Sequence, residues 1–200
     1  MGRFFACIQI YNSHKIAREN IIEEFIKIIN SNGYCPSNQE DFVISYALAF
    51  SANNRWITVG SNDYKDNSSH SYKDAQQIAM FMETSSFCME VVDSDFADIK
   101  LYNKSGHSDT VIVGRSYFSE EESPKGKSEC WKHLLIEGKT WNDLSIVWNK
   151  EEVFVEDALC EAADLLGIDQ NYMLSDYDDL KNNTENDNNI LLLYFKKTNC

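Results

Sequence analysis

Hydrophobic and polar residues alternate in several short runs along the first half of the chain, and this period of two predicts strands. In residues 4–11, Phe4, Ala6, Ile8 and Ile10 share one strongly apolar face. Residues 42–50 are apolar on both faces, as a central strand would be. Further strand-like runs lie at residues 55–60, 87–93, 96–103 and 110–115.

Two helical patterns separate these runs. In residues 15–31 the apolar positions Ile21, Phe25 and Ile29 recur at helical spacing. The second helix is predicted from Ser71-x-x-Asp74, a capping-box pattern, to about residue 84. The order βαββαβ predicts an α+β fold with a ferredoxin-like core, in which both helices pack on one face of the sheet. Additional antiparallel strands would extend this core, which covers residues 1–115.

The second half of the chain is mostly helical in pattern. A charged, turn-rich stretch at 116–129 marks the start of an acidic, mainly helical annex that covers 116–189. Its longest helix is predicted at 151–166, and the Asp- and Asn-rich stretch 176–189 is predicted to be a mobile loop. The apolar run ILLLYFKK then predicts a final strand within 190–198. We expect this strand to return to the sheet, so that residues 1–200 form a single folding unit.

Charge is distributed unevenly along the sequence. The net charge is −14, yet residues 1–60 hold five basic and five acidic side chains. Residues 151–189 hold twelve acidic side chains and one lysine, Lys181. Such a field repels phosphate backbones and anionic membranes, so we expect no direct binding to nucleic acid and no membrane association. A basic protein is the partner that this charge would attract.

The acidic annex therefore supplies the candidate partner-binding residues. Acidic side chains in 151–166 alternate with the buried stripe of the predicted helix, which is also typical of a solvated helix face. In the loop that follows, acidic side chains lie among tyrosines, a combination that suits docking of a basic partner. The candidates are Glu156, Asp157, Tyr172, Asp176, Tyr177, Asp178 and Asp179.

A second acidic group, Asp93, Asp95 and Asp98, is the candidate metal site. Carboxylates at this density can hold Mg²⁺ or Ca²⁺ through oxygen ligands, although the spacing does not match an EF-hand loop. The alternative is a tight turn between two strands, in which Asp and Ser bond to the local backbone. A divalent cation is the one cofactor that the sequence suggests, and no other is predicted.

Other chemistry-bearing patterns are weaker. Cys130 and His133 lie three positions apart, but no second pair of zinc ligands has suitable spacing. Phosphate-binding, dinucleotide-binding, serine-hydrolase and metalloprotease motifs are all missing from the sequence, which favours a non-enzymatic protein. Trp131, Trp141 and Trp148 suit either core packing or an aromatic-lined groove.

Cysteine use and the N-terminus indicate a cytoplasmic protein. The six cysteines are scattered one per predicted element, with no C-x-x-C pair, so we expect reduced thiols. No apolar run approaches the about 20 residues that span a bilayer. The first residues alternate and lack the continuous apolar stretch of a signal peptide.

The turn that contains two of the candidate metal ligands carries one resemblance. Residues 93–106, read as D-S-D-x5-L-Y-x3-G, resemble a hairpin of uncharacterised bacterial cytosolic proteins. The resemblance covers this hairpin and implies no activity.

Together these observations support three hypotheses about function. The leading one is a non-enzymatic interaction protein, and its concrete form is an immunity or inhibitor protein that covers a basic partner with an acidic surface. The second is an enzyme or metal-binding protein that uses the three aspartates. The third is a structural subunit of a homo-oligomer, and the sequence leaves the oligomeric state open.

Overall fold

One antiparallel sheet with helices on both faces organises the chain. The computed structural model describes residues 2–114, 124–150 and 154–198. The sheet has the strand order β2-β8-β3-β4-β1-β5-β6-β7, and every neighbouring pair is antiparallel. Its strands are β1 Phe5–Tyr11, β2 Tyr34–Pro36, β3 Ile44–Phe50, β4 Trp56–Ser61, β5 Ser86–Val92, β6 Phe96–Asn103, β7 Gly106–Gly114 and β8 Ile190–Lys197. The α+β prediction is therefore confirmed.

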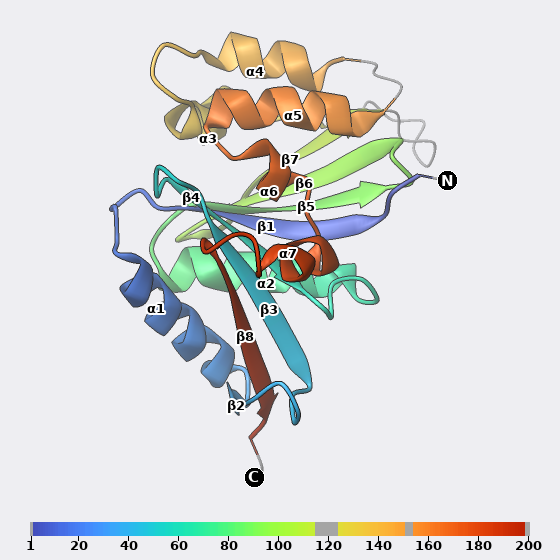
Figure 1. Ribbon diagram of the computed structural model, residues 1–200. Helices are drawn as coiled ribbons and strands as arrows, with labels where there is room; N and C mark the ends of the chain where they lie inside the picture. The colour runs from blue at the N-terminus through green and yellow to red at the C-terminus, as the bar shows by residue number, and fades with distance from the viewer. Residues whose placement is uncertain (1, 115–123, 151–153, 199–200) are drawn as a thin grey trace.

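The helices form two layers (Figure 1). On one face lie α1 and α2, as the sequence predicts, and on the other lie the helices of the C-terminal part. The elements are α1 Arg18–Ser31, α2 Ser68–Phe81, α3 Ser128–Trp131, the 3-10 helix η1 Lys132–Leu134, α4 Trp141–Trp148, α5 Val155–Leu166, α6 Gln170–Met173 and α7 Tyr177–Asn183.

Each face of the sheet has its own core. Ile8 and Ile10 of β1 pack with Phe25 of α1 and Ile78 of α2, whereas Cys7 of β1 belongs to the core beneath α3, α4 and α5. This double coverage buries six of the seven β1 residues, so the strand has two buried faces where the sequence showed one strongly apolar face. A smaller core lies between α7 and β3, where Ala47 and Ala49 leave room for the helix.

The final strand occupies the position that its apolar sequence requires. β8 lies between β2 and β3, and its residues Ile190–Phe195 pair with Ala49–Ile44 of β3. The prediction that this segment returns to the sheet is confirmed. The short strand β2 was not predicted, because a three-residue strand carries no detectable periodicity.

Two local predictions are wrong. Residues 176–189 are not a loop throughout, because Asp176 caps the helix α7 through a capping box with Asp179. The Ser71-x-x-Asp74 pattern does not begin a helix, because α2 begins at Ser68 with Asn67 as its N-cap. Ser71 and Asp74 are instead buried positions within the helix. By contrast, Thr140 and Asp143 form the predicted capping box of α4.

The three tryptophans belong mainly to the core beneath α4 and α5. Trp131 and Trp148 are buried, and their ring centroids lie 4.5 Å apart in an edge-to-face arrangement. Trp141 is half-buried, and its ring lies 5.8 Å from that of Trp148. The structure thus selects core packing over a groove for this set.

Candidate functional site

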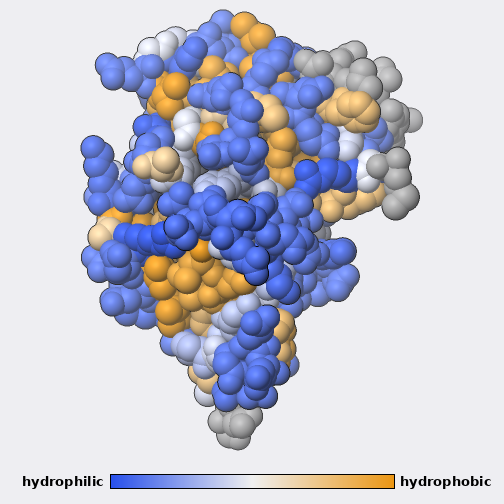
Figure 2. Space-filling view, viewed as in Figure 1, coloured by the Kyte–Doolittle hydropathy of each residue, from blue (hydrophilic) through white to orange (hydrophobic). Residues whose placement is uncertain are grey.

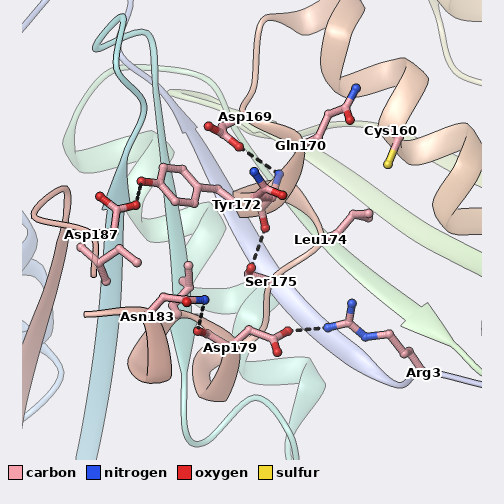
Figure 3. A pocket seen from close by; sticks show the side chains of 13 residues that line it. Arg3, Cys160, Asp169, Gln170, Tyr172, Leu174, Ser175, Asp179, Asn183 and Asp187 are labelled. Carbon is pink, nitrogen blue, oxygen red and sulfur yellow. Dashed lines mark hydrogen bonds and ion pairs between the residues drawn. The ribbon is translucent and has the colours of Figure 1, made fainter. Parts of the chain in front are cut away.

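A groove of about 620 Å³ is formed mainly by α6, α7 and the segments that flank them, with Cys160 of α5 and Ile190 of β8 at its edges. We call it the acidic groove. Its charged lining residues are Asp169, Asp179, Asp187 and Arg3. Figure 3 shows Arg3 and Asp187 at opposite ends of the groove, with Tyr172 between Asp187 and Asp169. Three carboxylates thus converge on one hollow, together with a single arginine.

Short helices hold two of these carboxylates in place. Asp169 is the N-cap of α6, and its Oδ1 accepts a hydrogen bond from the Asn171 amide at 2.9 Å. In α7, Asp176 Oδ1 accepts from the Asp179 amide at 2.8 Å, and Asp179 Oδ2 accepts from the Asp176 amide at 3.3 Å. Because capping fixes these side chains against the backbone, the groove presents oriented oxygen atoms.

Asp187 is fixed by a tyrosine. The hydroxyl of Tyr172 donates to Asp187 Oδ2, and the Asn189 amide donates to Asp187 Oδ1 at 2.9 Å. The hydrogen bond from Tyr172 is the main reason that the pKa of Asp187 is lowered. Burial, followed by this same bond, raises the pKa of Tyr172. Asp187 therefore stays negative at neutral pH.

Arg3 lies against one of the three carboxylates of the groove. Its Nη2 forms a hydrogen-bonded ion pair with Asp179 Oδ2, and its guanidinium carbon lies 4.8 Å from the centre of the Phe5 ring. A carboxylate beside an aromatic face is a common environment for an arginine side chain. Asp169 and Asp187 form no ion pair with the described residues.

The predicted partner-binding residues are divided by the fold. Tyr172 and Asp179 line the acidic groove, whereas Asp176, Tyr177 and Asp178 line a smaller neighbouring pocket of about 60 Å³. Tyr177 is buried, and its hydroxyl oxygen accepts a hydrogen bond from Ser45 at 2.7 Å. Its backbone packs on Gly60, where an added Cβ would lie 2.9 Å from Tyr177 Cα.

The two helix residues among these candidates lie outside the groove lining. Asp157 is exposed on α5. Glu156 is half-buried, and its Oε1 accepts a hydrogen bond of 2.6 Å from Ser94. The carboxylate of Glu156 therefore fastens the start of α5 to the turn between β5 and β6.

The candidate metal residues also separate. Asp93 lies in the β5–β6 turn with φ 52°, and its Oδ1 accepts from the Gly2 amide at 3.0 Å. Asp98 lies in β6, where its Oδ2 pairs with Lys100 at 3.1 Å. The Asp95 amide closes the turn by donating to Val92 O at 3.0 Å. Within the described ranges, no three His, Cys, Asp or Glu side chains come together as a metal site would require.

Cys130 and His133 likewise have separate environments. Cys130 Sγ contacts Ser108 O at 3.7 Å, while His133 Nε2 lies 3.0 Å from the Ser85 hydroxyl. Burial lowers the pKa of His133. The helical spacing of the pair therefore produces no shared site.

Of the four charged groove residues, only Asp179 is among the predicted site residues, whereas Arg3, Asp169 and Asp187 are not. Asp169 carries a local signal, since it follows the helix-ending Gly167 and begins another helix, but this signal indicates capping only. Arg3 carries no local signal at all, because its contact with Asp179 depends on the tertiary fold.

Comparisons of the chain with family models, with curated proteins and with solved structures found no match. Among the helices that the structure describes, none is long and apolar enough to cross a membrane.

Proposed function

We propose that this protein is a non-enzymatic interaction protein that binds a basic protein partner through the acidic groove. An immunity or inhibitor protein of the bacterial cytoplasm, with reduced thiols, is the concrete form of this proposal. The observation that carries it is Arg3, whose guanidinium already occupies one end of the groove against Asp179. A lysine or arginine of the partner would meet Asp169 and Asp187 in the same way.

The surface around the groove supports this kind of partner. Hydrophilic side chains gather over α7 and the segment before β8, and a hydrophobic patch lies next to them in the region of α1 and β8 (Figure 2). Partly buried Ile22 and Ile26 come from α1. Partly buried Leu191, Leu192 and Leu193 come from β8, where Leu193 packs with the α1 core and Leu192 with the α7 core. Charged and apolar surface in one region is typical of protein interfaces, where charge speeds association and apolar contact adds affinity.

The net charge of −14 supports the same partner class over longer distances. Charges of one sign raise the association rate of an oppositely charged protein, and salt screens this effect. Binding that depends on the groove should therefore weaken as ionic strength rises.

The proposal includes a ferredoxin-like core. The elements β1, α1, β3, β4, α2 and β5 follow one another as βαββαβ once the short β2 is set aside. Their strands lie in the order β3-β4-β1-β5 within the sheet, and this order supports the assignment. Strands β6 and β7 extend the core at one side, and β8 and β2 extend it at the other.

The test is a pull-down from the native host with two variants of equal net charge. The groove variant carries Asp169→Asn, Asp179→Asn and Asp187→Asn. The control carries Glu40→Gln, Asp41→Asn and Asp66→Asn, three exposed positions outside the groove lining. We expect a basic protein to bind the wild type and the control at low salt and to dissociate from both at high salt. The groove variant should not bind this protein. Recovery of no basic protein by the wild type, or equal loss in both variants, would overturn the proposal.

A further inference from the structure

A second cavity lies on the opposite face of the sheet from the acidic groove. It has a volume of about 240 Å³ and is formed by the end of α1, the strands β2 and β3, and the first turns of α2. Apolar walls come from Ile29 and Ile44, and aromatic walls come from Tyr34 and Tyr46. Pockets for drug-sized ligands begin at about 300 Å³, so this cavity suits a smaller molecule.

Asp74 is the buried polar group of this cavity. Asp74 is only 8% exposed. Its Oδ2 accepts hydrogen bonds from the hydroxyls of Tyr46 at 3.0 Å and Tyr64 at 2.9 Å. These tyrosines are themselves buried, with 3% and 2% exposure. The other oxygen, Oδ1, accepts no hydrogen bond from the described parts of the chain. Two phenols thus orient the carboxylate and leave one oxygen available.

The charge of Asp74 has no contacting counter-ion among the described residues. His70, which also lines the cavity, pairs with Asp63. Lys73 also lines the cavity, but it is exposed and forms no ion pair with Asp74. Burial of an ionised carboxylate without a contacting cation is costly, and burial raises the pKa of Asp74 although the tyrosine hydrogen bonds and the nearby His70 and Lys73 act to lower it. A cation from a ligand would offset this cost.

We propose that this cavity binds a small organic cation, namely a short aliphatic amine. The ammonium group would donate to Asp74 Oδ1 and lie near the aromatic ring of Tyr34 or Tyr46. Its aliphatic part would contact Ile29 and Ile44. This site is independent of the acidic groove, and binding here would need no protein partner.

Calorimetric titration with butylamine and diaminobutane tests the proposal, with butanol as the uncharged match. At neutral pH both amines are protonated, because alkylammonium groups titrate near the lysine value of about 10.4. We expect the amines to bind and butanol not to bind. Asp74→Asn should weaken amine binding at least about tenfold, which corresponds to about 1.4 kcal/mol. Asp178 is exposed and lies outside the cavity, so Asp178→Asn should leave the affinity for the amines unchanged.

A second variant keeps the test decisive if Asp74→Asn does not fold. Ile44→Phe fills the cavity while leaving the carboxylate and its tyrosines in place, so it should also abolish amine binding. Absence of amine binding to the wild type would overturn the proposal, as would equal binding of butanol. Unchanged amine affinity in a folded Asp74→Asn or Ile44→Phe variant would also overturn it, and would identify Asp74 as part of a purely structural hydrogen-bond network.

Discussion

Arg3 Nη2 forms an ion pair with Asp179 Oδ2, although 176 residues separate the two positions in the chain. The contact joins the segment before β1 to the helix α7, and it places the one basic side chain of the acidic groove. Both side chains are nearly half exposed, at 46% and 44%. At such exposure an ion pair contributes little to stability, so its main effect is on the charge of the groove.

Arg3→Gln should therefore change binding more than stability. Loss of an exposed pair lowers the free energy of unfolding by about 0.2–1 kcal/mol, which urea denaturation would measure. Affinity for poly-lysine at low salt should rise, because Asp179 becomes available and the groove loses its positive charge. Lys104→Gln is the control, since it makes the same charge change at an exposed turn. Equal gains in affinity for both variants would show that the position of the charge is irrelevant.

Gly60→Ala should destabilise the packing of α7 on the sheet. The new Cβ would lie 2.9 Å from both N and Cα of Tyr177, a distance that requires the helix to move. Such overpacking costs about 1–3 kcal/mol, measurable by thermal or urea unfolding. Ser61→Ala, at the next position of β4, adds no volume and should cost less. Similar stability of Gly60→Ala and the wild type would contradict the tight contact between β4 and α7.

Substitutions of Asp176 test whether the stability of α7 depends on the capping hydrogen bond of this residue or on its negative charge. Asp176→Ala removes the oxygen that accepts from the Asp179 amide, which should cost about 0.5–2 kcal/mol of unfolding free energy. Asp176→Ser removes the same negative charge but keeps a capping oxygen, so it should retain most of the stability. Equal destabilisation by both substitutions would mean that charge, and not capping, stabilises this helix.

Asp74 should make stability fall as pH rises. Burial raises its folded pKa above the ordinary value of 3.8. Between that value and the folded pKa, the folded state binds more protons than the unfolded state, so this group lowers the free energy of unfolding with increasing pH. Asp74→Asn removes the titration, so its stability relative to the wild type should improve as the pH rises above about 4, and should level off once Asp74 is ionised in the folded wild type. Urea unfolding across this range would measure it, and a constant difference would contradict the prediction.

Thiol reactivity should follow burial. Cys7 is fully buried, and burial raises its pKa to about 12, so little thiolate forms at neutral pH. Cys88 is also buried, whereas Cys35 and Cys130 are partly exposed. Brief alkylation of the native protein, followed by peptide mass spectrometry, should label Cys35 and Cys130 before Cys7 and Cys88. Early labelling of Cys7 would indicate that the core beneath α5 opens readily.

Local patterns of the sequence determined most of the elements of this fold. Alternation in residues 4–11 and the helical spacing of Ile21, Phe25 and Ile29 depend on neighbours in the chain, and each predicts its own element. The capping box of Thr140 and Asp143 is equally local, since both partners lie within one helical turn. The pattern of Asp74 misled the prediction for a related reason: a spacing alone does not distinguish a helix start from a buried position within a helix.

The sites were decided by the tertiary structure. Contacts between distant segments bury both faces of β1 and pack α7 on Ala47 and Ala49. They also bring Arg3 to Asp179. The acidity of residues 151–189 is visible in the sequence, but the sheet and its helices select which carboxylates share a groove. Likewise, only packing brings Tyr46 and Tyr64 to Asp74, because side chains far apart in the chain meet only after the sheet and helices assemble.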